Sequence, residues 1–191
     1  MPQTSNIPSI DSATCIFDMN AVNEAIDQVA SSINQYFCEQ ASEPFELLVM
    51  PLMNGGLVFS GVLLPKLAMN ITLDYFHVTR YRDTNTGGDD IEWRVLPKQN
   101  VAGKHVLLLD DIYDHGITLD VVVNWCKDQN VASVSSAVLA SKNIANPEIR
   151  EHLVSPTFSA MTLPDAYVFG AGMDFKGYHR NAPGIFTFDE C

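Results

Sequence analysis

The sequence predicts an α/β fold with a parallel-sheet core flanked by helices. Four segments are almost continuously apolar, which is typical of strands buried on both faces of a sheet, and helical patterns follow the first and the third. These strand-like segments are residues 45–50, 72–78, 105–111 and 135–141. The chain has 191 residues, 47% of them hydrophobic, which is enough for one sizeable core and favours a single domain over residues 1–191.

In the N-terminal half, the spacing of apolar residues and the positions of Pro and Gly predict where helices and strands lie. Apolar residues that step by three or four predict an amphipathic helix, and they are Met19, Val22, Ile26, Val29, Ile33 and Phe37. Residues 47–65 carry no charge over 19 positions, which is close to the length of a membrane-spanning helix. Because Pro51 and the sequence Asn54-Gly55-Gly56 interrupt this segment, we predict a strand, a glycine turn and a helix.

Composition argues against several classes of function. With 11 Lys and Arg against 23 Asp and Glu, the net charge is −12, which repels nucleic-acid backbones and anionic membrane surfaces, so neither is an expected partner. Cys15, Cys38, Cys126 and Cys191 are far apart and lack metal-binding spacing, as expected of reduced thiols. No secretory signal is visible at the N-terminus, so we expect a cytoplasmic protein.

The third strand leads into an unusual arrangement of acids and glycine, VLLLDDIYDHGITL (residues 106–119). Gly116 lets an anion approach the main chain, and the helix that begins at Ile117 offers free N–H groups to a phosphate, to which Thr118 can add a hydroxyl. The adjacent Asp110 and Asp111 can accept hydrogen bonds from vicinal hydroxyls or hold a hard cation. Ribose 5-phosphate has both features, and in open α/β sheets ligands bind beyond the carboxyl ends of strands.

These residues resemble the phosphoribosyl-pyrophosphate binding motif of the type I phosphoribosyltransferases, and residues 45–191 resemble the hypoxanthine-guanine branch of that family. The resemblance implies that Asp110 and Asp111 hold the ribose hydroxyls and that Asp114 is catalytic, facing purine nitrogen 7. It also implies that residues 115–118 cradle the 5-phosphate. His115 and Ile117 stand where the family more often has Thr or Ser and Lys, but the cradle consists mainly of main chain.

Two further segments resemble family loops. MNGG (residues 53–56) is similar to the pyrophosphate loop, which implies that Asn54, Gly55 and Gly56 bind pyrophosphate, often after a cis peptide. Asn54 replaces a common Lys. The polar residues 79–93 resemble the flexible catalytic loop, with Arg80 and Tyr81 at the position of a common Ser-Tyr pair; a merely disordered loop is the alternative.

The purine site is expected near the end of the fourth strand. There Lys142 resembles the family's donor to the 6-oxo group, although an ordinary solvated lysine is the alternative, and residues 143–155 form a longer excursion than in familiar members. Residues 164–181 resemble the purine-binding hood and its arginine motif. By this resemblance Tyr167 stacks on the base, Val168 offers main-chain groups, Asp174 binds magnesium and Arg180 meets pyrophosphate. The expected core is about residues 40–142, with the hood formed by the N-terminal segment and about 143–191.

The resemblance implies a purine salvage enzyme. It would transfer the 5-phosphoribosyl group from phosphoribosyl pyrophosphate to hypoxanthine or guanine, giving IMP or GMP and pyrophosphate, with Mg²⁺ held by Asp174, Asp110 and Asp111. We expect a homodimer or homotetramer. Three alternatives stay open: a xanthine-preferring enzyme, a non-catalytic regulator of the same fold, and a receiver-like signalling domain, which would not account for the glycine cradle or the hood.

Overall fold

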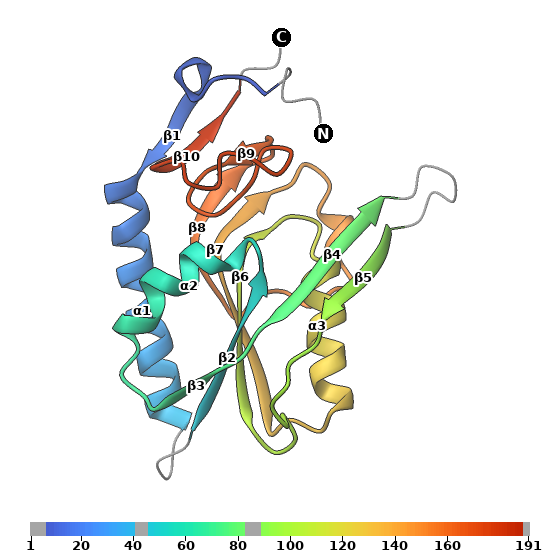
Figure 1. The fold of residues 1–191 in the computed structure, drawn as a ribbon. Coiled ribbons are helices and arrows are strands. Elements are labelled where there is room, and N and C mark those ends of the chain that lie inside the picture. Colours follow the sequence, from blue (N-terminus) through green and yellow to red (C-terminus); the bar gives the residue numbers. More distant parts are fainter. Residues whose placement is uncertain (1–6, 41–45, 83–88, 189–191) are drawn as a thin grey trace.

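The computed structural model describes residues 7–40, 46–82 and 89–188 and has a seven-stranded central sheet (Figure 1). Six strands run in the order β5-β4-β2-β6-β7-β8, and β3 pairs with β2; all neighbours are parallel except β4 and β5. The strands are β2 (Leu47–Met53), β3 (Ile71–Leu73), β4 (Phe76–Arg82), β5 (Asp89–Val95), β6 (His105–Tyr113), β7 (Ser133–Asn143) and β8 (Phe158–Pro164). The predicted fold class is confirmed.

Helices cover both faces of this sheet, as the apolar strands require. On one face α1 (Met19–Gln40) and α2 (Gly56–Leu63) pack against Leu47 and Val49 of β2, whereas on the other face α3 (Ile117–Asp128) packs against Leu48 and Met50. Successive residues of one strand therefore enter opposite cores, which is the two-residue period of a strand. The described residues also contain three short 3₁₀ helices: η1 (Ile10–Ser12) precedes β1 (Thr14–Asp18), η2 (Leu64–Lys66) follows α2, and η3 (Pro147–Arg150) lies between β7 and β8.

A second, smaller sheet joins the two ends of the chain. We call it the hood sheet; it consists of β1 (Thr14–Asp18), β10 (Gly184–Thr187) and β9 (Val168–Phe169) in antiparallel order β1-β10-β9. In Figure 1 it lies above the carboxyl ends of the central strands. The central sheet continues past residue 142 because β8 pairs with β7, so only the later part of residues 143–191 belongs to the hood sheet.

Most predicted elements occur, and one is divided. The helix over α1 and the strand, turn and helix over residues 47–63 are present, and within the described residues no helix combines the length and apolar character needed to span a bilayer. The segment 72–78 is not one strand but parts of β3 and β4. Asp74 lies at the break, where its carboxylate accepts the N–H groups of Lys98 and Gln99 at 2.8 and 2.9 Å. The chain keeps its direction across the break, because β3 and β4 both pair with β2 in the same parallel register.

Candidate active site

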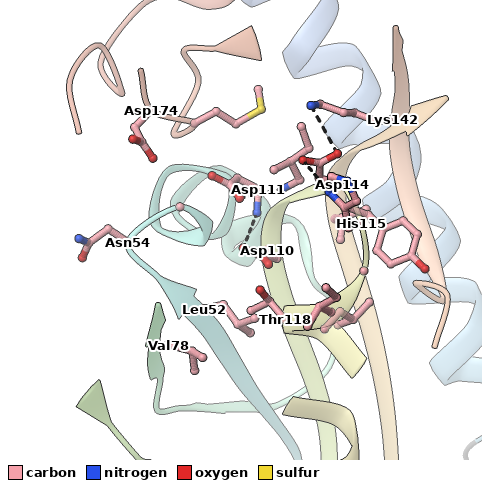
Figure 2. Close-up of a pocket in the computed structure, with 18 of the residues that line it drawn as sticks. Leu52, Asn54, Val78, Asp110, Asp111, Asp114, His115, Thr118, Lys142 and Asp174 are labelled. Atoms are coloured by element: carbon pink, nitrogen blue, oxygen red, sulfur yellow. Dashed lines mark hydrogen bonds and ion pairs between the residues drawn. The ribbon is translucent and has the colours of Figure 1, made fainter. Parts of the chain in front are cut away.

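A cleft of about 800 Å³ lies between the central sheet and the hood, at the carboxyl ends of β2, β6 and β7 and beside the first half of β4 (Figure 2). It brings together most of the predicted site residues from segments that are distant in sequence. Its lining includes Asn54, Gly55, Asp110, Asp111, Asp114, His115, Gly116, Ile117, Thr118, Lys142, Tyr167, Val168, Asp174 and Arg180. The acids of β6 and its following turn form the floor of the cleft, and Asp174 faces them from the hood side.

The turn after β6 has the geometry of an anion cradle. Gly116 has φ +90°, in the left-handed region, and α3 begins at the next residue, Ile117. A Cβ on Gly116 would lie 2.8 Å from the ring of Tyr113, so the position requires glycine both for its backbone conformation and for space. The first N–H groups of α3 have no intrahelical acceptor and open toward the cleft with the positive end of the helix dipole. The predicted phosphate cradle therefore has a matching backbone.

Asp110 and Asp111 form a half-buried acidic pair inside β6, which extends two residues beyond them to Tyr113. The N–H of Asp111 donates to Asp110 Oδ1 at 2.9 Å, and the N–H of Ile112 donates to Asp111 Oδ1 at 2.8 Å. Burial, reinforced by the neighbouring Asp111, raises the pKa of Asp110 well above its ordinary value of 3.8. Burial also raises the pKa of Asp111, against the opposing effects of the Asp110 hydrogen bond and of Arg180. A bound cation or hydroxyl donors would stabilise the ionised form of both carboxylates.

The loop after β2 packs directly on this acidic pair. The Met53–Asn54 peptide is cis. A Cβ on Gly55 would lie 2.1 Å from Asp111 Oδ2, and one on Gly56 would lie 2.6 Å from the carbonyl oxygen of Leu109. Neither position can accommodate a side chain, so the glycines let the loop lie against β6 and expose its main chain to the cleft.

Asp114 lies between two nitrogen-bearing side chains, those of Lys142 and His115, at the other end of the cleft. Its Oδ1 lies 3.4 Å from Lys142 Nζ, and its Oδ2 lies 3.4 Å from His115 Nδ1 (Figure 2). The side chain of Lys142 is only 13% exposed, so it is held within the site at the end of β7. This burial and pairing argue against the alternative of an ordinary solvated lysine.

The hood supplies one aromatic ring and one ion pair. Tyr167 is 56% exposed and lines the cleft, and its hydroxyl donates to the carbonyl of Asp174 at 3.3 Å. Arg180 Nη2 lies 2.6 Å from Asp174 Oδ1, while Arg180 Nη1 donates to the carbonyl of Gly172 at 2.7 Å and lies 3.9 Å from Asp111 Oδ2. Arg180 therefore links the acid of the hood to the acids of the core.

Two predicted catalytic residues and most of the predicted loop are only partly described. The backbone of Arg80 and Tyr81 belongs to β4, but their side chains lie outside the described residues, as do residues 83–88. The roles given to them stay predictions. Conversely, sequence reasoning missed Arg150, whose guanidinium contacts the main chain beneath Asp114. Its signal is weak but present, because it is the single Lys or Arg between Lys142 and Lys176.

The described residues do not form a self-sufficient metal centre. Among them, no three Asp, Glu, His or Cys side chains converge closely enough to hold an ion by themselves. Mg²⁺ usually keeps several waters and binds through one or two carboxylates together with substrate phosphates. The acidic pair and Asp174 are donors of that kind, so they fit an ion that arrives with a phosphorylated substrate.

The fold and the site together define a class of protein. The family model described as phosphoribosyl transferase domain matches residues 12–174, and the chain belongs to this family. Among its relatives, the hypoxanthine-guanine phosphoribosyltransferase of Streptococcus pneumoniae is 29% identical over 143 residues, which cover 75% of this chain and 77% of the relative. The hypoxanthine-guanine-xanthine phosphoribosyltransferase of Tritrichomonas foetus is 25% identical over 170 residues, covering 89% and 88%.

Solved structures agree on the architecture. A Trypanosoma cruzi hypoxanthine phosphoribosyltransferase, solved with its product IMP, superposes with a TM-score of 0.82 at 21% identity, covering 96% of this chain and 95% of that one. At this identity the likeness shows the fold.

Proposed function

We propose that the protein transfers the 5-phosphoribosyl group from phosphoribosyl pyrophosphate to hypoxanthine or guanine, giving IMP or GMP and pyrophosphate. One observation carries the proposal: a single cleft contains the glycine cradle, the acidic pair and the Lys142–Asp114 pair. These groups suit, in turn, a 5-phosphate, the ribose hydroxyls and a 6-oxopurine. The names of the relatives support the same reaction.

The sugar phosphate is bound mainly by main chain and acids. The N–H groups of residues 115–118, with the Thr118 hydroxyl, bind the 5-phosphate at the start of α3. Asp110 and Asp111 accept hydrogen bonds from the ribose hydroxyls. The exposed main chain of the Asn54–Gly55 loop and the guanidinium of Arg180 bind pyrophosphate.

Asp110, Asp111 and Asp174 would hold Mg²⁺ together with the substrate. Bound magnesium supplies charge neutralisation for the leaving pyrophosphate. The residues themselves keep the ribose in one orientation, so that its anomeric carbon faces the base, and their negative charge favours the oxocarbenium-like transition state.

Lys142 and Asp114 recognise two neighbouring groups of the base. The ammonium of Lys142 donates to a 6-oxo group, and the carboxylate of Asp114 accepts the hydrogen at purine nitrogen 7, where positive charge develops as nitrogen 9 attacks. Tyr167 stacks on the ring, and the main chain of Val168 meets its edge. Since the relative from T. foetus also carries xanthine in its name, a preference for xanthine is the second candidate. The homodimer or homotetramer and the cytoplasmic location stay predictions.

Two measurements test the proposal. Millimolar phosphoribosyl pyrophosphate with magnesium should raise the melting temperature, since a ligand at a hundred times its Kd stabilises by about 2.7 kcal/mol. Steady-state assays with hypoxanthine, guanine, xanthine and adenine should then show turnover of the 6-oxopurines. Binding without turnover of any base would favour the non-catalytic regulator, and absence of both would contradict the proposed function.

A further inference from the structure

The connection between β7 and β8 carries an arginine that reaches beneath the cleft. Arg150 ends η3 and donates from Nε to the carbonyl of Asp114 at 2.6 Å, from Nη2 to the carbonyls of Tyr113, at 2.9 Å, and Asp114, and from Nη1 to the carbonyl of Lys142 at 3.0 Å. One planar guanidinium therefore binds three main-chain carbonyls from the ends of two neighbouring strands.

These carbonyls lie at the point where the sheet can no longer hold the two strands together. The pairing of β6 with β7 ends at Tyr113 and Ser141, one residue before Asp114 and Lys142. Beyond that point no β6–β7 ladder pairing holds the two chain segments in register. Arg150 supplies charge-assisted hydrogen bonds there, which are shorter and stronger than neutral ones.

The arginine is held in place by its own surroundings. The connection is fixed on α3 by a hydrogen bond from the N–H of Val154 to Asp120 Oδ1 at 3.0 Å. The Arg150 Cζ lies 4.3 Å from the centre of the buried Tyr113 ring, and the same ring lies against Gly116. Guanidinium, ring and cradle glycine thus form one packed stack below the site.

We propose that Arg150 is a positioning residue that sets the spacing of Asp114 and Lys142, and thereby the recognition of the 6-oxopurine. This inference rests on the proposed function. Arg150 acts through the main chain: by fixing the carbonyls of Asp114 and Lys142, it fixes the two Cα positions from which the side chains reach their 3.4 Å contact. A lysine cannot replace it, because one ammonium lacks the planar fork that meets three acceptors.

The proposal makes a base-specific prediction. Arg150→Ala should lower kcat/KM for hypoxanthine by about 10- to 100-fold, because misplacing reacting groups by about 1 Å can cost 10²-fold. It should also narrow the ratio of kcat/KM between hypoxanthine and adenine. Added guanidinium ion at non-denaturing concentration should restore part of the hypoxanthine activity, and Arg150→Lys should be intermediate. The exposed neighbour Glu151 provides the control, since Glu151→Gln should stay within about twofold of the wild type.

Hydrogen exchange on the ligand-free protein gives a readout that needs no turnover. Amides of residues 113–118 should exchange faster in Arg150→Ala than in the wild type, and should be unchanged in Glu151→Gln. If the wild type uses no purine at all, the proposed function fails, and exchange still decides whether Arg150 fixes this turn.

Two results would overturn the inference: unchanged exchange at residues 113–118, or an unchanged ratio of kcat/KM between hypoxanthine and adenine, which includes an equal loss with every base. If Arg150→Ala does not fold, the same measurements on Arg150→Lys decide.

Discussion

At the residue scale, the acidic pair of β6 lowers the stability of the ligand-free protein, and the same carboxylates are the groups proposed to bind the substrate. Asp110 and Asp111 are half-buried and adjacent, and burial raises the pKa of both. A carboxyl group with a raised pKa is harder to ionise in the folded state than in the unfolded chain. Its contribution to the free energy of unfolding is therefore complete when the pH is below the ordinary pKa of the unfolded chain, and it is lost as the pH rises through the raised pKa of the folded state.

Asp110→Asn should consequently stabilise the ligand-free protein at pH 8 while it impairs binding. The amide removes the buried charge, and a gain of about 1 kcal/mol would raise the melting temperature by roughly 2–4 °C in a chain of this size. This gain in stability should shrink as the pH falls through the raised pKa. Over the same pH range the wild type should lose affinity for phosphoribosyl pyrophosphate with magnesium. Thermal melts between pH 4 and pH 8 measure the gain in stability, with the exposed Glu24→Gln as a control. An Asn variant that melts lower at every pH would contradict this account.

Asp114→Asn should separate chemistry from binding. The amide keeps the shape of the side chain but removes the charge that faces purine nitrogen 7, and groups in such roles typically contribute about 10²- to 10⁴-fold. The single-turnover rate should fall in that range while phosphoribosyl pyrophosphate still raises the melting temperature. An unchanged rate would remove Asp114 from the reaction.

Lys142→Gln should alter the choice of base. The ammonium can only donate, so it satisfies the 6-oxo group and faces the amino group of adenine with a second donor; such mismatches can discriminate by about 10⁴-fold or more. A glutamine amide can donate or accept. The variant should therefore lose much of its kcat/KM for hypoxanthine and discriminate less against adenine. If both quantities are retained, the donor that recognises the purine is not Lys142 but a group of the hood.

At the element scale, the sequence predicts elements that carry their own periodicity or their own glycine signal. The helix α1, the strand and helix around Asn54-Gly55, and the turn at Gly116 are local patterns, and all are present. The strand β9, at two residues, has no period to detect, and its pairing with β10 joins segments far apart in the chain. Arg150 was missed for a related reason: its acceptors are carbonyls, which leave no mark in the sequence, and two of them are 36 and 37 residues away.

The loop after β2 gives a direct test of close packing. Gly55→Ala places a Cβ 2.1 Å from Asp111 Oδ2, so either the loop or the carboxylate must move, and affinity for phosphoribosyl pyrophosphate should fall at least about tenfold, the effect of roughly 1.4 kcal/mol. Gly61 offers a matched control inside α2, because a Cβ there meets nothing within 4 Å. Gly61→Ala should keep the affinity and stabilise by about 0.5–1 kcal/mol. Equal binding by both variants, measured by calorimetry, would show that the loop tolerates displacement.

At the scale of the whole molecule, the site is closed by the meeting of the core and the two ends of the chain. Gly172 of the hood lies against the loop after β2, since a Cβ on it would be 2.8 Å from the carbonyl oxygen of Gly55. Arg180 continues this contact to Asp111. The hood sheet that positions Tyr167 depends on β10, whose Thr187 hydroxyl donates to the Tyr167 carbonyl at 2.9 Å, and β10 in turn pairs with β1. The N-terminal strand is therefore connected to the purine site, although it contributes no lining residue to the cleft.

Gly184→Ala tests this long-range dependence. Gly184 has φ +147°, and a Cβ on it would lie 2.6 Å from the carbonyl oxygen of Phe17, so the substitution should separate β1 from β10 and loosen the segment that carries Tyr167 and Val168. We expect the KM for hypoxanthine to rise about tenfold or more, the effect of roughly 1.4 kcal/mol of lost binding, while the affinity for phosphoribosyl pyrophosphate changes little. Gly103→Ala is the control, because Gly103 has φ +73° but open space around it. That variant should lower the melting temperature through backbone strain alone and leave the KM for the base unchanged. If both variants raise this KM equally, or if Gly184→Ala weakens both substrates alike, the hood sheet does not act on the purine site separately from general stability.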